Sequence, residues 1–355
     1  MHALQIIAGK RAYQRIRERN FTPDDIQLIL GASGGPKWFV LSHLDRLINR
    51  EILPKVTHPV ELAGSSIGAW RMACYAAADP VAALQRLEEN YLHQSFTEAK
   101  TPEAVSLQCH QMLERVLGPD YSPQLDRHMH IIAARCKGIT THEGPWKQAA
   151  AFATVAGANL ISRKSLRWYF DRHLVQSHPG TLPVTHFPDF RTTASHLSEQ
   201  NLYPALMASA SIPMALSPVH DIPGSSPGVY RDGGMVDYHF DLPFDVPDGL
   251  ILYPHFSPTL KPGWFDKPLK WRRVKAEHYQ DVVMLMPTES FIASLPHGKI
   301  PDRTDFDRLS ERERMDYWRR AVQAGERLAD EFHEWVAGGA TGATVKPFKP
   351  EQLSG

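Results

Sequence analysis

Three serines of this chain stand at the centre of a Gly-x-Ser-x-Gly window: Ser33, Ser66 and Ser226. Where this pattern does chemistry, a buried strand leads into a sharp turn at the serine and a helix follows at once, which exposes the hydroxyl as a nucleophile. The N-terminus of that helix also stabilises negative charge that develops beside it. The pattern is short and the chain has 23 glycines, so the flanking sequence has to distinguish the three windows.

Ser66 has the flanking sequence that this chemistry requires. The segment PVELA before it is typical of a strand, and IGAWRMACYAAA after it is typical of a helix. Gly64 and Gly68 stand two residues on either side, where larger side chains would collide between the strand and the helix. We therefore predict that Ser66 is the nucleophile. The alternative is that none of the serines is catalytic.

The other two windows fit less well. Pro227 directly follows Ser226, and the surrounding HDIPGSSPGVY is typical of a hairpin loop. Ser33 follows a strand, but Pro36 favours the first position of a helix and leaves this serine in a loop.

The stretch GASGGPKW, which contains Ser33, has a different use. Gly34 and Gly35 would allow backbone N–H groups to approach an acyl oxygen, and such oxyanion donors are worth roughly 3 to 4 kcal/mol each. Lys37 would brace this loop or contact the substrate. A Walker-type phosphate loop needs glycine before the lysine and serine or threonine after it, whereas proline and tryptophan stand there. The alternative to an oxyanion loop is that this stretch is a loop that binds no ligand.

A general base is the third requirement. The segment YRDGGMVDY places Asp232 at the end of a strand, with Gly233 and Gly234 freeing the turn that follows. A carboxylate with an ordinary pKa of about 3.9 is a weak base for serine unless burial raises that pKa. A strand-end Asp-Gly-Gly alone indicates a turn, but together with Ser66 and the glycine loop it indicates a base.

Short apolar runs alternate with segments of helical period along the chain, which predicts an α/β fold of strands connected by helices. Apolar residues also recur along one face from residue 311 to 336, which predicts a long helix that packs on the body of the protein. We expect one domain over residues 1–337. Residues 338–355 are rich in glycine, threonine, proline and lysine and are expected to form a loose tail.

The composition limits the partners and the compartment. The chain has 39 basic and 39 acidic residues, so no net field steers it to nucleic acid or to an anionic membrane. Three cysteines without paired spacing favour a reducing compartment. The N-terminus lacks the features of a secretory signal, and the longest weakly polar stretch, 149–161, is too short to span a bilayer. We expect a soluble, cytoplasmic protein that contacts a membrane at most from one side.

The ordered set LILGASGGPKW, AGSSIGAW and YRDGGMVD resembles the patatin-like phospholipases, and ALMASASIPMAL is similar to a stretch which that family places ahead of its aspartate. The resemblance covers roughly residues 26–78 and 201–255. It implies a three-layer α/β/α sandwich with a mostly parallel central sheet and a nucleophile elbow. It also implies a Ser66–Asp232 dyad, oxyanion donors in the glycine loop, and hydrolysis of lipid acyl esters without metal or cofactor.

The glycine loop departs from the pattern of that family, which is usually Gly-Gly-Gly-x-Arg/Lys-Gly. Here Ser33 stands at the first glycine and Trp38 at the last. The oxyanion hole is therefore expected to be narrower or to be built partly from Ser33.

Two other readings remain open. The first is a Ser–His–Asp hydrolase, which would use His239 or His255, because both follow Asp232 in the chain order of the α/β-hydrolases.

A metal site is not favoured. His128 and His130 share a strand face, but no further metal ligands cluster with them in the sequence.

The other reading is a catalytically inactive module that binds a lipid or a protein partner. The aromatic residues Trp146, Phe152, Trp168 and Tyr169 would line an acyl cleft in either an enzyme or a module, or else pack in the core.

Overall fold

The computed structural model describes residues 2–99 and 101–349 of the chain. The strands are β1 Leu4–Ala8, β2 Ile26–Gly31, β3 Val60–Ser65, β4 Arg127–Cys136, β5 Phe170–Gln176, β6 Thr192–His196, β7 Val219–His220, β8 Val229–Asp232, β9 Leu250–Pro254, β10 Val282–Pro287 and β11 Lys346–Pro347. The α-helices are α1 Lys10–Arg19, α2 Ser42–Leu47, α3 Ile67–Ala76, α4 Pro80–Leu92, α5 Pro102–Leu117, α6 Pro145–Ile161, α7 Glu199–Ala210, α8 Glu289–Ser294, α9 Asp305–Arg308 and α10 Glu311–Ala337. Short 3₁₀ helices important for the site are η2 Gly35–Leu41, η7 Gly233–Met235 and η8 Trp264–Asp266.

All these strands join one mixed sheet, in which β11, β1, β10, β9, β2, β3, β4, β5 and β6 follow one another and β8 pairs with both β4 and β7. The central run from β10 to β4 is parallel. Strands β1, β5 and β8 join it antiparallel. The predicted α/β class with a large, mostly parallel central sheet is therefore confirmed.

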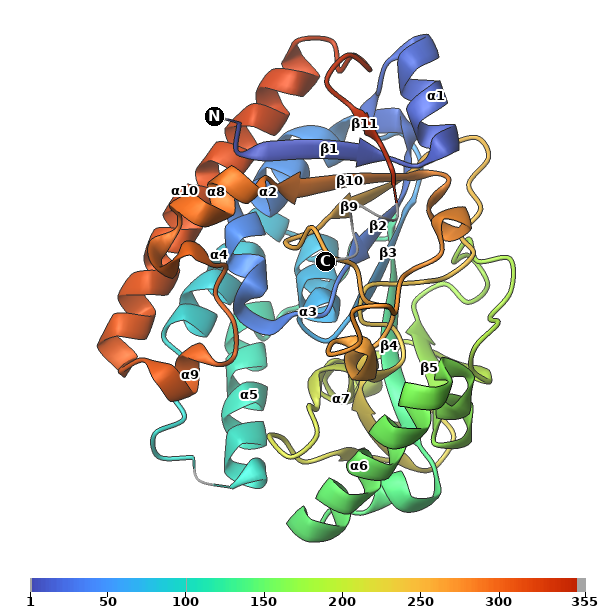
Figure 1. Ribbon diagram of the computed structural model, residues 1–355, viewed down its shortest axis with the longest axis vertical. Helices are drawn as coiled ribbons and strands as arrows, with labels where there is room; N and C mark the ends of the chain where they lie inside the picture. Colours follow the sequence, from blue (N-terminus) through green and yellow to red (C-terminus); the bar gives the residue numbers. More distant parts are fainter. Residues whose placement is uncertain (1, 100, 350–355) are drawn as a thin grey trace.

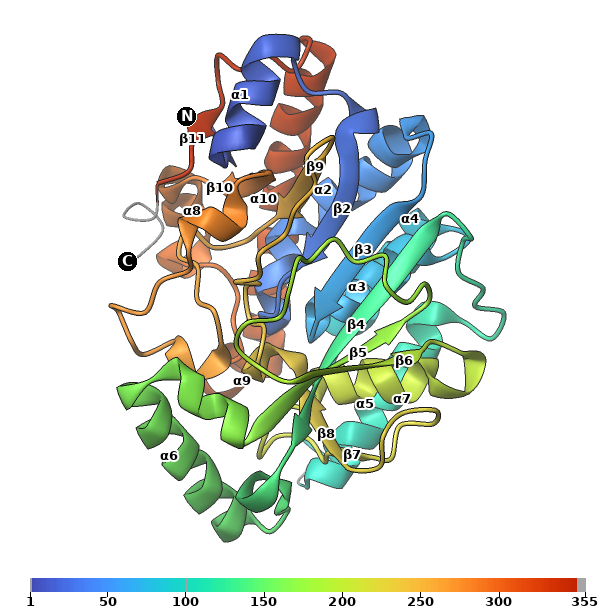
Figure 2. The ribbon, with the colours of Figure 1, turned by 90° about the vertical axis from the view of Figure 1, so that its right-hand side faces the viewer.

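The long helices are distributed unevenly over the two faces of this sheet (Figures 1 and 2). Helices α2, α3, α5 and α7 lie behind the sheet in Figure 2, and extended segments cross much of the face toward the viewer. Helix α6 stands apart at the lower end of the molecule in both views. Within the described ranges, no helix is long and apolar enough to cross a membrane.

Burial explains why the central elements form where they do. All ten residues of α3 are buried, because its small and apolar side chains pack closely against β2, β3 and β4. Helix α10 instead places one apolar stripe, including Trp318 and Phe332, on the body of the protein. Its first turn is closed by a capping box between Ser310 and Glu313. The predicted long helix is therefore confirmed, over Glu311–Ala337.

The segment after α10 differs from the loose tail that its composition predicted. Strand β11 pairs in parallel with β1, and the Phe348 ring stacks on Tyr279 at 5.1 Å. Val345 is buried as well. The expectation of a loose tail is thus wrong for residues 338–349, because apolar side chains in this segment reach the core, and its remaining part, 350–355, lies outside the described residues.

Candidate active site

Strand β4 aligns the two halves of the site. Strand β3 runs beside β4 until Ser65, which pairs with Ile132. Strand β8 then takes up the same edge of β4, and its last residue, Asp232, pairs with Ala133. Because Ile132 and Ala133 are consecutive, the end of β3 and the end of β8 meet, and the residue after Ser65 lies beside Asp232.

Ser66 occupies the sharp turn between β3 and α3. Its backbone has φ 55° and ψ −132°, outside the regions that non-glycine residues prefer. Such a conformation costs roughly 1 to 3 kcal/mol and persists only where the surroundings hold it. The Ser66 N–H donates to Ser209 Oγ at 2.9 Å, and Ser209 Oγ donates to Ile132 O at 2.6 Å. These contacts tie the strained turn to β4.

The Ser66 hydroxyl donates to Asp232 Oδ2 at 2.8 Å. The other carboxylate oxygen of Asp232 accepts the Gly234 N–H at 2.7 Å. Asp232 is only 7% exposed, and its burial raises the pKa of Asp232 from 3.8 to about 6, against the opposing effect of the hydrogen bonds from Ser66 and Gly234. At neutral pH the carboxylate is ionised and is a stronger base than an exposed aspartate.

Gly34 and Gly35 lie beside this pair, and both line a cavity that also contains Ser66 and Asp232. A Cβ atom on Gly34 would approach the Phe256 ring to 2.2 Å, and Gly35 has φ +57°. Within the described ranges, neither N–H hydrogen-bonds to another backbone or side-chain atom. The sequence therefore needs glycine at both positions, and the two N–H groups remain available to a ligand.

Ser33 has no such free donor. Its N–H donates to Tyr238 O at 3.1 Å. Its hydroxyl lies 2.7 Å from Ser65 Oγ, which itself donates to Asp237 O, so the Ser33 proton is directed to Ser65. The expectation that Ser33 contributes to an oxyanion hole is corrected accordingly: Ser33 holds the loop against β3.

The supporting glycines lie where the chain is most crowded. A Cβ atom on Gly68 would come within 1.8 Å of Gly31 O, and one on Gly64 would come within 2.5 Å of Gly68 O. A Cβ atom on Gly233 would come within 2.1 Å of Ile132 O. Bare backbone at these positions allows α3 and the turn after β8 to reach their places beside the sheet.

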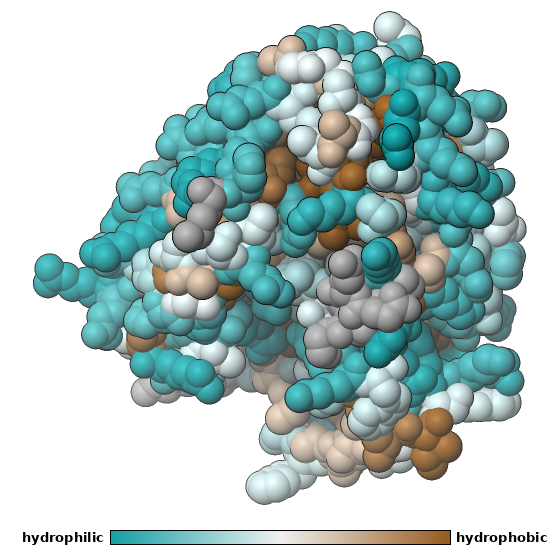
Figure 3. Space-filling view, turned by 45° about the horizontal axis from the view of Figure 1, so that its top comes forward, coloured by the Kyte–Doolittle hydropathy of each residue, from teal (hydrophilic) through white to brown (hydrophobic). Residues whose placement is uncertain are grey.

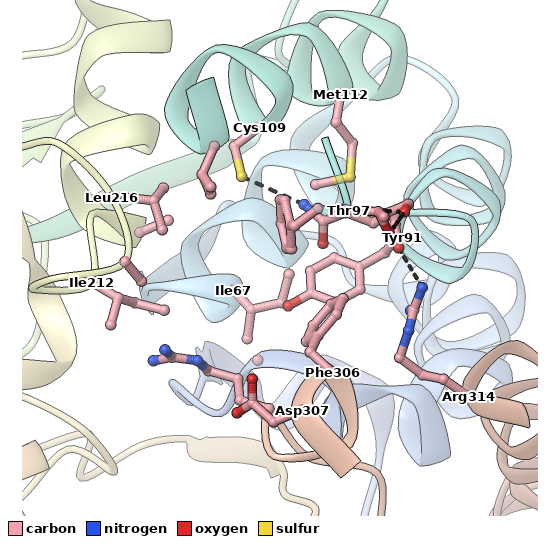
Figure 4. A pocket seen from close by; sticks show the side chains of 18 of the residues that line it. Ile67, Tyr91, Thr97, Cys109, Met112, Ile212, Leu216, Phe306, Asp307 and Arg314 are labelled. Atoms are coloured by element: carbon pink, nitrogen blue, oxygen red, sulfur yellow. Dashed lines mark hydrogen bonds between the residues drawn. The ribbon is translucent and has the colours of Figure 1, made fainter. Parts of the chain in front are cut away.

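Two cavities meet at Ser66. The first cavity, about 590 Å³, lies between α3, α5, α9 and the segment after α7. It is called the apolar cavity after its aliphatic, aromatic and sulfur-containing side chains, although Asp307, Glu311 and Arg314 also line it. The polar cavity, about 360 Å³, contains Asp232, the glycine loop and Lys37. Ser66, Gly35, Ile212 and Arg303 line both. Figure 4 shows the apolar cavity and the side chains of Ile67, Cys109, Met112, Ile212, Leu216 and Phe306 that surround it.

The histidines of the alternative triad make other contacts. His255 is fully buried, its Nδ1 is 2.8 Å from Ser257 O, and burial lowers the pKa of His255 to about 3. His239 lines the polar cavity, but its Nδ1 accepts the Lys261 N–H. In the described parts of the chain, neither imidazole hydrogen-bonds to Ser66 or Asp232. The dyad is therefore the arrangement that the geometry favours.

The remaining sequence candidates lie elsewhere. His128 and His130 both contact the Glu61 carboxylate, at 2.8 and 2.5 Å. Trp146 and Trp168 lie on the surface, 87% and 71% exposed, so neither packs in the core, and neither lines the two cavities at Ser66.

Three residues that shape the site were not predicted from the sequence. Ser209 falls within the stretch ALMASASIPMAL, so its position was visible although its contact with Ser66 was not. Lys267 and Arg303 line the polar cavity from loops far along the chain, and no pattern in the sequence marks either of them.

A scan against protein-family models finds no match for this chain, and no curated protein matches it. The fold and the site together define a class: an α/β protein whose mixed sheet presents a buried, hydrogen-bonded serine–aspartate pair at the end of a parallel strand, between an apolar and a polar cavity.

Proposed function

We propose that this protein is a serine acyl hydrolase of the patatin-like kind, with a three-layer α/β/α architecture, that cleaves acyl esters of lipids or lipid-like compounds. One observation carries the proposal: the hydrogen bond from Ser66 to the buried Asp232 at the junction of the two cavities. A strained elbow serine beside a carboxylate of raised pKa is suited to nucleophilic catalysis. The apolar cavity is of a size and character suited to an acyl chain.

In the proposed reaction, Asp232 accepts the hydroxyl proton while Ser66 Oγ attacks the carbonyl carbon of the ester. The Gly34 and Gly35 N–H groups stabilise the negative charge on the carbonyl oxygen. Asp232 then returns the proton to the departing alcohol, which leaves an acyl-enzyme on Ser66. Water, deprotonated by Asp232, attacks this ester and releases the carboxylic acid and the free Ser66 hydroxyl.

A fluorophosphonate probe, which reacts with activated serines, tests the proposal. Labelling is expected for the native protein and for Ser226→Ala, the matched control in another Gly-x-Ser-x-Gly window, and it is expected to vanish in Ser66→Ala. Folding of each variant is checked by circular dichroism. Unlabelled but folded native protein would instead support a lipid- or partner-binding module.

A substrate panel then defines the reaction. Phospholipids, lysophospholipids, monoacylglycerols and short nitrophenyl esters are compared by release of the free acid, with Ser66→Ala as the blank.

A further inference from the structure

The polar cavity contains three cationic side chains that form no ion pair with any residue that the structure describes. Lys37, Lys267 and Arg303 all line it, on the same cavity as Ser66 and Asp232. In residues 2–99 and 101–349, none of the three side chains forms an ion pair or donates a hydrogen bond. The Lys267 amine lies instead 4.2 Å from the centre of the Tyr238 ring, and the Lys37 amine lies 5.8 Å from that of Phe256.

The acidic groups of this cavity are engaged elsewhere. The Asp232 carboxylate accepts hydrogen bonds from Ser66 and Gly234. Asp302, the other carboxylate lining the cavity, lies 3.0 Å from Lys299 Nζ and also accepts from Thr304. Neither has a direct contact with the three cations, so the cavity carries an excess of positive charge.

The environment of Lys267 disfavours its charged form. Burial first, and then the nearby Lys37, lower the pKa of Lys267 to about 7, against the opposing effect of Asp232 and Asp302. Clustered cations repel one another, and an anion between them would relieve that repulsion. The arrangement is therefore preorganised for a negatively charged group.

The position of the cations relative to Ser66 fixes which part of a substrate they would meet. Arg303 borders both cavities, and a Cβ on Gly35 would lie 3.4 Å from Arg303 Cγ. With the acyl chain in the apolar cavity and the ester carbonyl at Ser66, the alcohol part of the ester extends into the polar cavity.

We propose that Lys37, Lys267 and Arg303 bind a phosphate group carried on the alcohol part of the ester, so that the preferred substrates are single-chain acyl esters of a phosphorylated alcohol. The placement of the substrate rests on the proposed function, whereas binding of phosphate in the polar cavity does not.

Binding is measured first, by calorimetry on full-length Ser66→Ala protein, which cannot turn over. We expect glycerol 3-phosphate to bind and glycerol not to bind. Lys267→Met and Arg303→Met, each in the Ser66→Ala background, are expected to weaken binding roughly tenfold or more, as loss of a hydrogen bond to a charged group predicts. Lys270→Met, at an exposed lysine three residues from Lys267 and outside the cavity, is the matched control and is expected to bind as Ser66→Ala does. Absence of glycerol 3-phosphate binding, or equal binding by all variants, overturns the anion site.

Kinetics then identify the source of the phosphate. We expect kcat/KM to be higher for a monoacylglycerol phosphate than for the monoacylglycerol of the same chain, and Lys267→Met to remove this preference through KM. Stimulation of monoacylglycerol cleavage by inorganic phosphate, without that preference, would overturn the substrate assignment in favour of a free anion. Anion binding without fluorophosphonate labelling would refute the proposed hydrolase alone, and labelling without anion binding would refute this proposal alone.

A second feature is independent of the cavities: apolar side chains gather on the outside of α6. Seven of the nine exposed large hydrophobic residues among the described ones lie on α6 or on segments against it, so they do not scatter as single surface residues do. They are Ile139, Trp146, Leu160, Ile161, Trp168, Met214 and Trp271, together called the α6 surface. Figure 3 shows brown and tan atoms at the lower end of the molecule, where Figure 1 places α6.

Basic residues surround this surface. The exposed cations on the same segments are Lys147, Lys164, Arg167, Lys270 and Arg273. Glu143, an exposed carboxylate just before α6, is paired with His220 at 2.7 Å. Exposed tryptophan and aliphatic side chains flanked by lysine and arginine are the combination that binds the interface of an anionic bilayer.

The α6 surface also adjoins both cavities. The Met214 N–H donates to Gln148 Oε1 of α6 at 2.5 Å, and its neighbours Ile212 and Ala215 line the apolar cavity. Asn159 of α6 donates to Asp266 of η8 at 2.9 Å, and Trp264 of η8 lines the polar cavity. A bilayer against α6 would therefore lie next to the site.

We infer that the α6 surface docks on an anionic lipid bilayer. The test is cosedimentation of the full-length protein with phosphatidylcholine vesicles that contain or lack phosphatidylglycerol. Native protein is expected to sediment with the anionic vesicles, and a Leu160→Ser/Ile161→Ser variant is expected to bind roughly tenfold or more weakly, because two apolar side chains no longer enter the lipid. Leu125→Ser, which alters an apolar residue that is 90% exposed just before β4, is the matched control and is expected to bind as the native protein does.

Two results would overturn this inference. One is native protein that stays in solution with anionic vesicles. The other is a dimer on size exclusion that the double variant abolishes, which would identify a second copy of the chain as the occupant. Cleavage of a short soluble nitrophenyl ester is expected to be unchanged in the double variant, which separates lipid docking from folding and from catalysis.

Discussion

The Ser66 hydroxyl donates its hydrogen bond directly to the Asp232 carboxylate, at 2.8 Å and across 166 positions of sequence. The contact depends on pairing to one strand, because the residues at the ends of β3 and β8 pair with consecutive residues of β4. The proposed roles of nucleophile and base therefore belong to two different side chains, and each can be tested by its own substitution.

Asp232→Asn removes the base and keeps the shape of the side chain. General-base catalysis contributes about 10²- to 10⁴-fold, so we expect kcat for a nitrophenyl ester to fall by about that factor, with KM little changed. Asp248→Asn, at an exposed carboxylate, is the matched control and should retain activity. Full activity of a correctly folded Asp232→Asn protein would exclude Asp232 as the base.

His255→Asn tests the alternative triad. Since His255 contacts Ser257 and neither member of the dyad, we expect kcat to stay within a few fold of the native value once folding is verified by near-UV circular dichroism. A loss of several orders of magnitude in a folded variant would favour a Ser–His–Asp mechanism.

The pH dependence of kcat/KM for a neutral ester should follow Asp232. Burial raises the pKa of Asp232 to about 6, and only the ionised carboxylate accepts the serine proton. Activity is therefore expected to rise as the pH increases through about 6 and to reach a plateau above it. A profile that is flat from pH 5 to pH 8 would contradict this assignment.

For a phosphorylated substrate we expect a second limb in the same profile. The pKa of Lys267 is lowered to about 7, so in the free enzyme its charge, and with it the capture of phosphate, is lost as the pH rises through that value. The groups that act on Lys267 are Lys37, Asp232, Arg303 and Asp302. The alkaline limb should vanish in Lys267→Met, and its persistence there would assign it to another group.

Ser209→Ala tests a positioning role. Ser209 accepts the Ser66 N–H and holds the elbow to Ile132, so its loss leaves a buried donor unpaired, at a cost of about 1 to 3 kcal/mol in stability. We expect the rate of fluorophosphonate labelling to fall as well, and Ser209→Thr to restore it. Loss of thermal stability with an unchanged labelling rate would leave Ser209 with a structural role only.

The sequence predicted the central strands because each is a short apolar run between turn residues. It also predicted the turn at Ser66, since the apolar residues before Ser66 follow the pattern of a strand and those after it follow the pattern of a helix. It did not predict the break in the segment after Gly35, where η2 and α2 are followed by a π-helical turn at Ile48–Ile52. In this segment the apolar residues are spaced as in an α-helix. That spacing does not determine whether each backbone N–H bonds to the carbonyl three, four or five residues earlier.

The contents of the polar cavity could not be predicted in this way. Lys267 and Arg303 come from loops that follow no period and reach the cavity only through the fold. Likewise, the Ser33 N–H donates to Tyr238 and the Ser33 hydroxyl bonds to Ser65, and only the folded chain brings these residues close.

Because pairing to β4 sets the spacing between the ends of β3 and β8, the length of the loops that connect the intervening elements is free to vary. Long insertions between α3 and β4, or between β5 and β8, would leave the reacting groups in place. A single residue inserted between Ile132 and Ala133 would separate them by about 3.3 Å and turn one partner to the opposite side of the sheet. The chain is thus expected to tolerate long insertions in its connecting loops but not a single added residue within β4.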